Sequence, residues 1–329
     1  MPHGVRPRHG SMQFWPRKRA KRIYPRVRTI KPAEKDVLVT FAGYKAGMTH
    51  IIVTDNRKNA LTKGEELFVP VTVIECPPLK IFSLRLYKKV GYGKNVVSEF
   101  FFKAAKEVSK KTFVPKKFSA KADLENIKAE EYDDATITVH TAPSKTGIGK
   151  KKPEIFELKL GGTIKDKIEF AKEHAEKEIR IGSVFKEGLF VDVHGITKGK
   201  GFQGPVKRFG VSIRQHKSEK TKRGPGSLGG WRAQGHVMWR VAHAGQTGFH
   251  QRTEYNKQIM KISDNASLVN PKGGFIRYGV VKNDFFLIKG SVHGPKKRLL
   301  IFTKATRSRI EKLEPPEINY ISLDSKQGT

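Results

Sequence analysis

The sequence has little of three things: cysteine, acidic residues and long apolar runs. Cys76 is the single cysteine, which excludes an internal disulfide and any cysteine-based zinc site. No stretch approaches the roughly 18 apolar residues of a membrane span. The N-terminus also lacks the apolar core of a signal peptide. These absences predict a cytosolic chain, and its 329 residues suffice for about two domains.

Acidic residues are scarce and unevenly placed. Against 65 Lys and Arg the chain has 31 Asp and Glu, a net charge of +34 that repels itself unless a polyanion neutralises it. Residues 1–31 hold ten Lys and Arg and no acid, and residues 195–256 hold 12 and two, whereas residues 93–178 hold 18 and 15. Solubilising lysines would not concentrate in Gly-rich and Pro-rich runs. Residues 1–31 and 195–256 are therefore predicted to contact phosphate, and residues 93–178 are predicted to face solvent.

Aliphatic residues are the scarce component of residues 195–256. This stretch has seven Ile, Leu or Val residues, but 12 Gly and six aromatic residues. So few aliphatic side chains cannot offset roughly 1–2 kcal/mol per residue of ordering entropy. Disordered chains, however, are poor in aromatic residues. The composition predicts a long loop that becomes ordered on a partly stackable anionic surface, with RNA the obvious candidate.

The N-terminal residues 1–36 are predicted to form an extended basic arm. Five prolines interrupt them, and PRKRAKR at 16–22 is a dense basic cluster. Such arms usually bind nucleic acid. A flexible tail or a localisation signal is the alternative.

Short β-branched and aromatic runs separated by turn residues predict a mainly β, α+β fold with an antiparallel barrel or sandwich. The expected strands are 37–41, 50–55, 69–76, 80–87, 135–141, 155–160, 189–195, 278–283, 285–290 and 298–304. Helical spacing is expected at 100–108 and at 163–178, where Thr163 and Asp166 resemble a capping box. Residues 93–178 are therefore interpreted as an α/β insertion.

Two motifs in the basic stretch invite enzymatic interpretations that the sequence disfavours. Gly199, Gly201 and Gly204 form a literal G-x-G-x-x-G, but a dinucleotide site also needs a following helix and an acidic residue about 20 positions later. Pro205 and several cations stand there instead. The four histidines of the stretch match no compact metal-ligand spacing. We find no catalytic constellation and expect no enzyme, no metal site and no cofactor beyond magnesium associated with RNA.

The two tryptophans of the stretch are predicted to differ in role. Trp231 lies in GPGSLGGWRAQG, where almost nothing apolar could bury it, so base stacking is the expected role. Trp239 has Val237, Met238 and Val241 nearby and is expected to be a packing residue.

Nine positions between Phe185 and Arg208 then match a known family. The run is F-x6-D-x2-G-x-T-x-GKG-x2-G-x3-R, with Phe185, Asp192, Gly195, Thr197, Gly199, Lys200, Gly201, Gly204 and Arg208. It resembles the signature of the large-subunit ribosomal protein L3 family. PRHGSMQFWPRKRAKR at 7–22 and AHAGQTGFHQRTEYN at 242–256 resemble its archaeal and eukaryotic branch, and the chain length resembles the archaeal type.

The resemblance implies a translation-protein-type β-barrel on the subunit surface, with an arm and an internal loop reaching into large-subunit rRNA. It further implies a role in early assembly, a loop tip at Trp231 near the peptidyl-transferase centre, and ribosomal proteins L-fourteen and L-twenty-four-e as neighbours. The expected domains are an arm (1–36), a discontinuous barrel (37–92, 179–195 and 262–310), a solvent-facing insertion (93–178), the loop (196–261) and a tail (311–329).

Charge, aromaticity and context together select the residues expected to bind rRNA. They are Arg6, Arg8, His9, Arg17, Lys18, Arg19, Lys21, Arg22, Arg26, Arg28, Lys198, Lys200, Lys207, Arg208, Arg214, His216, Lys217, Lys222, Arg223, Trp231, Arg232, His236, Arg240, His243, Gln246, His250 and Arg252. We expect a structural constituent of the large ribosomal subunit. A non-ribosomal nucleic-acid-binding or assembly factor is the alternative, and a nucleotide-dependent enzyme is disfavoured.

Overall fold

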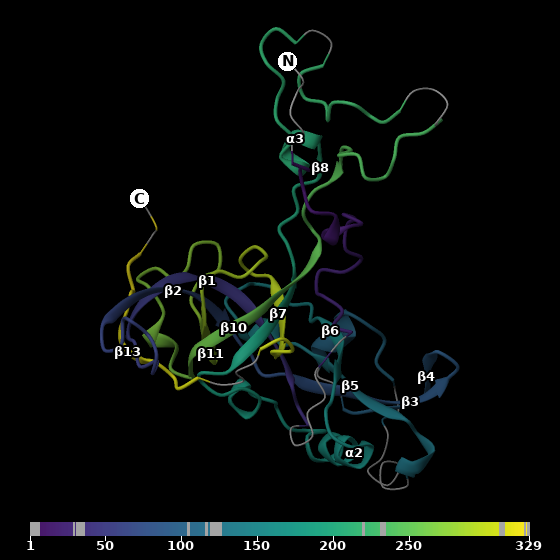
Figure 1. Ribbon diagram of the computed structural model, residues 1–329. Helices are drawn as coiled ribbons and strands as arrows, with labels where there is room; N and C mark the ends of the chain where they lie inside the picture. Colours follow the sequence, from purple (N-terminus) through teal and green to yellow (C-terminus); the bar gives the residue numbers. More distant parts are fainter. Residues whose placement is uncertain are drawn as a thin grey trace. The chain divides into compact units, whose positions relative to one another are not determined.

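The computed structural model (Figure 1) describes residues 7–28, 30, 37–103, 106–115, 118, 127–218, 221–230, 235–308, 313–325 and 327. Strands predominate over helices among them, in agreement with the predicted α+β class of mainly β character. The chain divides into two units. Unit 1 comprises Met1–Ile23 and Ile196–Arg252, and unit 2 comprises Tyr24–Gly195 and Thr253–Thr329.

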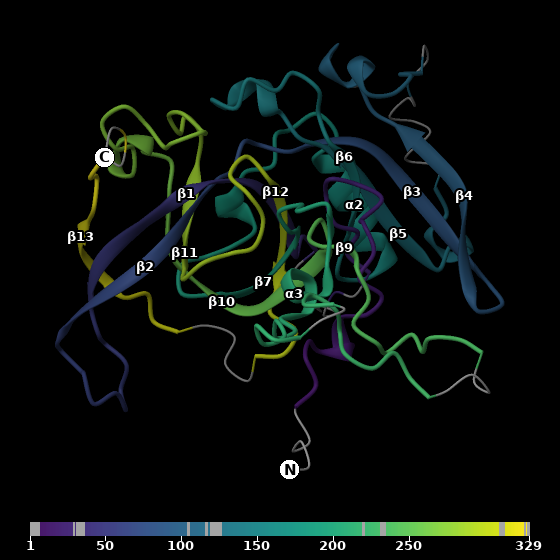
Figure 2. The ribbon, with the colours of Figure 1, turned by 90° about the horizontal axis from the view of Figure 1, so that it is seen from above.

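The larger sheet of unit 2 has seven strands. They are β1 (Thr40–Thr54), β2 (Glu66–Glu75), β7 (Phe190–Ile196), β10 (Gln251–Ser263), β11 (Phe285–Lys289), β12 (Leu299–Lys304) and β13 (Glu317–Ile321). Their order is β12-β7-β10-β11-β2-β1-β13, and β12 also pairs with β1, so the pairings return to their starting strand. Figure 2 shows the strands of this ring around a common centre. β1 is antiparallel to each of its partners β2, β12 and β13.

Alternation along β1 and β2 explains which side chains of this sheet are buried. Successive side chains of a strand point to opposite faces. On β1, Ile51 and Val53 are buried while Met48 is exposed, and on β2, Val69 is buried while Phe68 is exposed. The buried set belongs to one continuous core that also includes the β11 and β12 aromatic residues. The burial of alternate β-branched residues is what makes these runs strands.

A second sheet of unit 2 has the order β4-β3-β5-β6. Its strands are β3 (Lys80–Val90), β4 (Gly93–Phe101), β5 (Asp134–His140) and β6 (Ile155–Lys159), and helix α2 (Ile164–Glu173) packs on β5 and β3. The predicted capping box is present, because Thr163 accepts from the Asp166 amide and Asp166 accepts from the Thr163 amide. Each acceptor satisfies a backbone N–H that the first helical turn leaves without a partner.

The described residues also form several short helices and strands. The 3-10 helices are η1 (Met12–Phe14), η2 (Lys106–Lys110), η3 (Ala129–Glu131), η4 (Pro143–Lys145), η5 (Ile181–Ser183) and η7 (Ala266–Leu268). Unit 1 also contains β8 (Phe202–Gln203), α3 (Pro205–Phe209) and β9 (Gly245–Gln246), and β8 pairs with β9. No helix of the described residues is long and apolar enough to cross a membrane.

The structure corrects two of the predicted elements. The helix expected at 100–108 is wrong: β4 continues to Phe101, which pairs with Ser83, and η2 begins only at Lys106. Phe100 and Phe101 are aromatic residues, which favour β-strands, and here they pair with β3. The strand expected at 278–283 is also wrong. The Asn270 amide bonds to Val281 and the Glu75 carboxylate accepts from the amides of residues 282 and 283, so side chains replace a strand ladder.

Other strands differ in extent from the sequence prediction. The strand expected at 37–41 begins only at Thr40, and it forms one strand, β1, with the strand expected at 50–55, running through Gly43 and Gly47. A Cβ at Gly47 would lie 2.4 Å from Cδ1 of Phe275, so glycine is there for close packing rather than for a turn. β4, β10 and β13 were not predicted. β10 was missed because QRTEYNKQIMKIS is mostly polar and lies half-buried.

Candidate nucleic-acid interface

Nearly all charged residues of unit 1 are lysines or arginines. Its two chain segments contain 19 Lys and Arg and a single acidic residue, Glu219. One carboxylate cannot neutralise that many cations. The charge of unit 1 therefore has to be balanced from outside the unit, by small anions or by a polyanion.

Arg208 holds the arm and the loop of unit 1 together. Its guanidinium donates to the main-chain oxygens of Gln246 (3.0 Å), His243 (2.8 Å) and Arg17 (3.2 Å). Arg17 donates in return to the main-chain oxygen of Arg208 at 2.7 Å. Burial lowers the pKa of both guanidinium groups, and each has a neighbouring arginine that lowers it further. These two cations thus organise backbone, and their like charges lie close together.

An aromatic cluster packs beside this arginine pair. Trp15 lies 5.6 Å from the Phe209 ring and 5.5 Å from the Trp239 ring, both measured between centroids. The Arg17 guanidinium stands 4.2 Å over the Phe209 ring, a cation–π arrangement. Gly10 closes the cluster: its φ is +79°, and a Cβ there would lie 2.6 Å from Cδ1 of Phe209. Phe209 is thus buried in unit 1 although few aliphatic residues surround it.

His250 joins the two segments from the other end of the loop. Its Nδ1 lies 2.9 Å from the Lys18 main-chain oxygen, and its Nε2 accepts from the Gly248 amide at 3.0 Å. Nδ1 must therefore carry the proton of a neutral ring. Burial lowers the pKa of His250 below its ordinary value, which keeps the ring neutral. The side chain is buried and is used within unit 1.

The glycines of the literal G-x-G-x-x-G shape a turn rather than a long helix. Gly201 has φ +70°, and Gly204 precedes α3, a helix of five residues that ends where Gly210 adopts φ +74°. α3 is a helix that the sequence did not predict, but it is only one turn long and its last turn carries Lys207 and Arg208. Among the described glycines of unit 1, Gly248 is the most tightly packed, since a Cβ there would lie 2.0 Å from the Lys198 main-chain oxygen.

The residues predicted to bind rRNA fall into three groups. Exposed in unit 1 are Arg8, Lys18, Arg19, Lys21, Arg22, Lys198, Lys200, Lys207, Arg214, His216, Lys217, Lys222, Arg223, His236, Arg240 and His243. Partly or fully buried in unit 1 are His9, Arg17, Arg208, Gln246, His250 and Arg252. Arg26 and Arg28 are exposed in unit 2. Arg6, Trp231 and Arg232 lie outside the described residues.

Trp239 departs from its prediction as a packing residue. Its side chain is 65% exposed, and its ring contact is with Trp15 rather than with the neighbouring aliphatic residues. Phe14 and Phe202 are also exposed large apolar residues of unit 1. Phe14 lies beneath the Arg252 guanidinium, 5.0 Å from its ring centroid. The surface of unit 1 thus combines exposed rings with exposed cations, which is the combination that binds single-stranded RNA.

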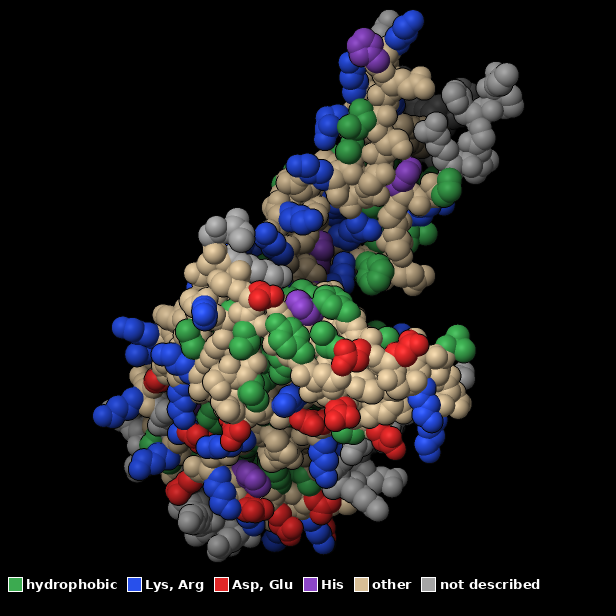
Figure 3. Space-filling model, turned by 90° about the vertical axis from the view of Figure 1, so that its left-hand side faces the viewer, with side chains coloured by type: hydrophobic (Ala, Val, Ile, Leu, Met, Phe, Trp, Pro, Cys, Tyr) green, Lys and Arg blue, Asp and Glu red, His purple; other side chains and the backbone are tan. Residues whose placement is uncertain are grey.

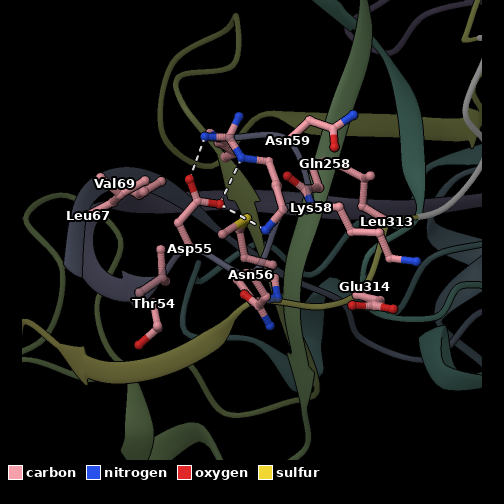
Figure 4. A pocket seen from close by; sticks show the side chains of 15 residues that line it. Thr54, Asp55, Asn56, Lys58, Asn59, Leu67, Val69, Gln258, Leu313 and Glu314 are labelled. Atoms are coloured by element: carbon pink, nitrogen blue, oxygen red, sulfur yellow. Dashed lines mark hydrogen bonds and ion pairs between the residues drawn. The ribbon is translucent and has the colours of Figure 1, made fainter. Parts of the chain in front are cut away.

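Unit 2 contains a cavity of about 540 Å³ (Figure 4). It is lined by Val53, Thr54, Asp55, Asn56, Arg57, Lys58, Asn59, Leu67, Val69, Gln258, Met260, Lys289, Leu313, Glu314 and Pro316. Asp55 accepts from Arg57 at 2.7 and 2.8 Å and from Thr62 at 2.7 Å. These hydrogen bonds lower the pKa of the Asp55 carboxyl, so it stays ionised and supports the turn rather than proton transfer. No group of three or more His, Cys, Asp or Glu in the described part of the chain is placed to hold a metal ion.

A family model described as ribosomal protein L3 matches residues 1–328. The chain belongs to the ribosomal protein L3 family. Three of its curated relatives, all archaeal, carry the name large ribosomal subunit protein uL3. The chain is 47% identical to the relative from Methanothermobacter thermautotrophicus, 44% to that from Archaeoglobus fulgidus and 43% to that from Methanocaldococcus jannaschii, over 98% of each chain. An L3 protein is a ribosomal protein and not an enzyme.

The L3 signature residues of unit 2 are structural. Phe185 is buried in the core. Asp192 is fully buried and accepts from the amides of Asn256 and Thr306, which are 3.0 and 2.9 Å away. A Cβ at Gly195 would lie 2.4 Å from Cδ2 of Leu300. In this L3 chain these signature positions therefore secure β7 and its neighbours.

Some L3 signature residues of unit 1 form hydrogen bonds within the unit, and another is exposed on its surface. Thr197 accepts from the His250 amide at 3.1 Å, and Arg208 holds the carbonyl groups described above. Lys200, in contrast, is exposed. Lys200 is thus the signature cation that remains available to a partner on the surface of unit 1.

Proposed function

We propose that this L3-family chain is a structural constituent of the large ribosomal subunit, and that unit 1 is the part that binds large-subunit rRNA. The observation that carries the proposal is the near absence of acid from unit 1, which has 19 Lys and Arg and one Glu. Its backbone is held by Arg17, Arg208 and His250, and its other described cations are mostly exposed at the surface, where phosphate can reach them. The site of action is the ribosome of the cytoplasm.

The finer features of the proposal follow from the family. The ring of strand pairings in unit 2 is proposed to be the translation-protein-type barrel, which was expected at 37–92, 179–195 and 262–310. The sheet that contains the ring also includes β10 (Gln251–Ser263) and β13 (Glu317–Ile321), whereas β3 (Lys80–Val90) belongs to the second sheet. The arm 1–36 and the loop 196–261, as far as β10, are proposed to be the rRNA-penetrating parts. The segments 93–178 and 311–329 are the solvent-facing insertion and the tail. Support comes from the pairing of β12 with both β7 and β1. Early assembly, proximity to the peptidyl-transferase centre, and L-fourteen and L-twenty-four-e as neighbours belong to the same proposal.

Unit 1 is proposed to bind RNA by two kinds of contact. Exposed lysines and arginines neutralise phosphates, and exposed rings such as Trp239 stack on unpaired bases. Arg17 and Arg208 act as positioning residues for these contacts because they bind backbone of their own unit. The arm is thus partly preassembled on the loop before RNA binds.

Sucrose-gradient fractionation in high salt tests the proposal. A tagged copy of the chain, expressed in an archaeal host, should co-sediment with large subunits at one copy per subunit, quantified against other large-subunit proteins. A free nucleic-acid-binding or assembly factor would instead dissociate in high salt or appear only on immature particles. Either of these results would contradict a constituent role.

A further inference from the structure

The outer face of β1, β2 and β13 is apolar although the protein is highly basic. Phe68 is 66% exposed, Tyr320 47%, Leu323 41% and Met48 38%. Phe68 and Tyr320 both lie opposite Ile52, on either side of β1. We call Met48, His50, Ile52, Phe68, Tyr320 and Leu323 the outer apolar face. Contiguous exposed apolar residues on a sheet mark an interaction site more often than an ordinary surface.

The rings of this face are already ordered. His50 stacks on Phe68 with ring centroids 4.5 Å apart, and the Tyr320 ring lies 6.4 Å from His50. The main chain beneath is braced as well, since Thr49 Oγ1 donates to the Ser322 main-chain oxygen at 2.7 Å. A partner would therefore meet a preformed surface and would lose little free energy to ordering it.

The charges around the outer apolar face have the opposite sign to those of unit 1. β1, β2 and β13 contain one cation, Lys45, which donates to the main-chain oxygens of Val292 and Gly294. Exposed acids stand at one end of the face instead, at Glu66 and Glu317, which both lie opposite Thr54 of β1. The nearest cations in the sequence, Arg57, Lys58 and Lys63, belong to the connection between β1 and β2, where Arg57 is paired with Asp55. Phosphate is therefore disfavoured on this face.

Figure 3 views unit 2 from the side on which these strands lie. Hydrophobic side chains gather there around a histidine, and acidic side chains lie close to them. β13 is also the last strand in the order of its sheet, so the far edge of β13 pairs with no strand of the described residues. An unpaired edge can accept an extended segment of another chain through main-chain hydrogen bonds.

We propose that the outer apolar face is a docking site for a protein, namely an extended segment of a neighbouring ribosomal protein that carries apolar side chains and Lys or Arg. The apolar side chains cover Phe68 and Tyr320, and the cations face Glu66 and Glu317. This inference rests on the proposed ribosomal function and deepens it, because it separates a protein-binding face on unit 2 from the RNA-binding surface of unit 1.

Site-specific photocrosslinking in purified large subunits tests the inference. Three variants carry a photoreactive phenylalanine in place of Phe68, Phe14 or Tyr92. Phe68 probes the outer apolar face, Phe14 is an exposed ring of unit 1, and Tyr92 is a fully exposed residue between β3 and β4. Because each residue is exposed and aromatic, all three variants should fold and enter subunits. Crosslinked products are separated into protein and rRNA by nuclease and protease digestion.

The expected result is a protein crosslink from position 68, an rRNA crosslink from position 14 and neither from position 92. The protein crosslink should be lost in a second variant that also carries Glu66→Lys and Glu317→Lys, while incorporation into subunits is retained. An rRNA crosslink from position 68, or no crosslink there, would overturn the docking proposal. Failure of all variants to enter subunits, with wild-type protein also absent from them, would instead contradict the proposed function.

Discussion

Arg17 and Arg208 each donate a hydrogen bond to the main-chain oxygen of the other, at 2.7 and 3.2 Å. Two residues 191 positions apart in the chain thus hold each other's backbone. The rigid planar fork of the guanidinium lets Arg208 hold the Arg17 carbonyl group together with those of Gln246 and His243, a geometry that the single ammonium of lysine does not provide. The arrangement joins the basic arm to the basic loop without any carboxylate.

Replacing Arg208 with lysine should loosen the arm in the free protein. Each hydrogen bond from a charged donor contributes about 1.5–3 kcal/mol. The lysine ammonium of Arg208→Lys lacks the planar fork that reaches all four carbonyl groups. Amide hydrogen exchange of residues 7–23 should become faster, while exchange in β1 and β2 of unit 2 stays unchanged. Lys207→Gln is the matched control, since Lys207 is the exposed neighbour on α3. Unchanged exchange in the arm of Arg208→Lys would contradict the positioning role.

Asp192→Asn should destabilise unit 2. The buried carboxylate accepts from the Asn256 amide, the Thr306 amide and the Thr306 hydroxyl. An asparagine presents one oxygen and an NH₂ group to three donors, so one donor is left without an acceptor. We expect a loss of about 1–3 kcal/mol in the free energy of unfolding, measured by urea denaturation. Asp264→Asn changes the same chemical group at an exposed position. Equal stability of the two variants would show that Asp192 is not needed for the fold.

His194 should make unit 2 less stable in acid. Burial lowers the pKa of His194 to about 4, and its ring lies 3.0 Å from the Thr253 hydroxyl and 3.1 Å from the Thr303 hydroxyl. The unfolded chain takes up this proton near pH 6.5 and the folded chain near pH 4, so acid favours unfolding. The stabilisation is present above pH 6.5 and is lost as the pH falls towards 4, by at most about 3 kcal/mol.

The measurement for His194 is the unfolding free energy between pH 7.5 and pH 4.5, in wild type and in His194→Gln. Glutamine keeps hydrogen-bonding capacity but does not titrate in this range. The wild type should therefore lose more stability than the variant over this interval. Parallel curves would assign the acid sensitivity to other groups.

Part of this architecture could be predicted from local sequence. The capping box of α2 and the strands β2, β3, β5 and β7 follow from hydrophobic patterning and from residues close together in the chain. The concentration of charge in unit 1 follows from composition. β10 could not be found in this way, because its polar residues form a strand only through pairing with β7 and β11.

The roles of single residues in unit 1 were also beyond local reasoning. In sequence, His250 resembles any other histidine of a basic loop. Only the structure shows that its two ring nitrogens are hydrogen-bonded to Lys18 and Gly248. Arg208 resembles Lys207 in charge, yet Arg208 binds four carbonyl groups and Lys207 is exposed. Trp239 has aliphatic neighbours in sequence but meets Trp15 in space. Each distinction depends on contacts between residues far apart in the chain.

Trp231→Ala should leave the stability of the free protein and its incorporation into subunits nearly unchanged, but should slow translation. The surrounding GPGSLGGWRAQG offers almost nothing apolar that could bury the indole, so we expect the indole to stack on RNA. Thermal unfolding, gradient sedimentation and translation in a reconstituted system measure the three quantities. Trp231→Phe is the control, because it retains a ring that can stack. A large fall in the unfolding temperature would place Trp231 in a protein core.

The salt dependence of rRNA binding should identify the cations that contact phosphate. Lys198 and Lys200 are exposed in unit 1, whereas Lys88 and Lys89 are a matched exposed pair on β3 of unit 2. Each phosphate contact contributes about 0.7–0.9 to the slope of log K against log salt concentration. Replacing Lys198 and Lys200 with glutamine should therefore reduce the slope by about 1.4–1.8, and replacing Lys88 and Lys89 should leave it unchanged. The slopes come from filter binding of the full-length chain to large-subunit rRNA between 50 and 200 mM salt, roughly the range over which such contacts show. Equal slopes for the two double variants would mean that unit 1 does not bind rRNA through these lysines.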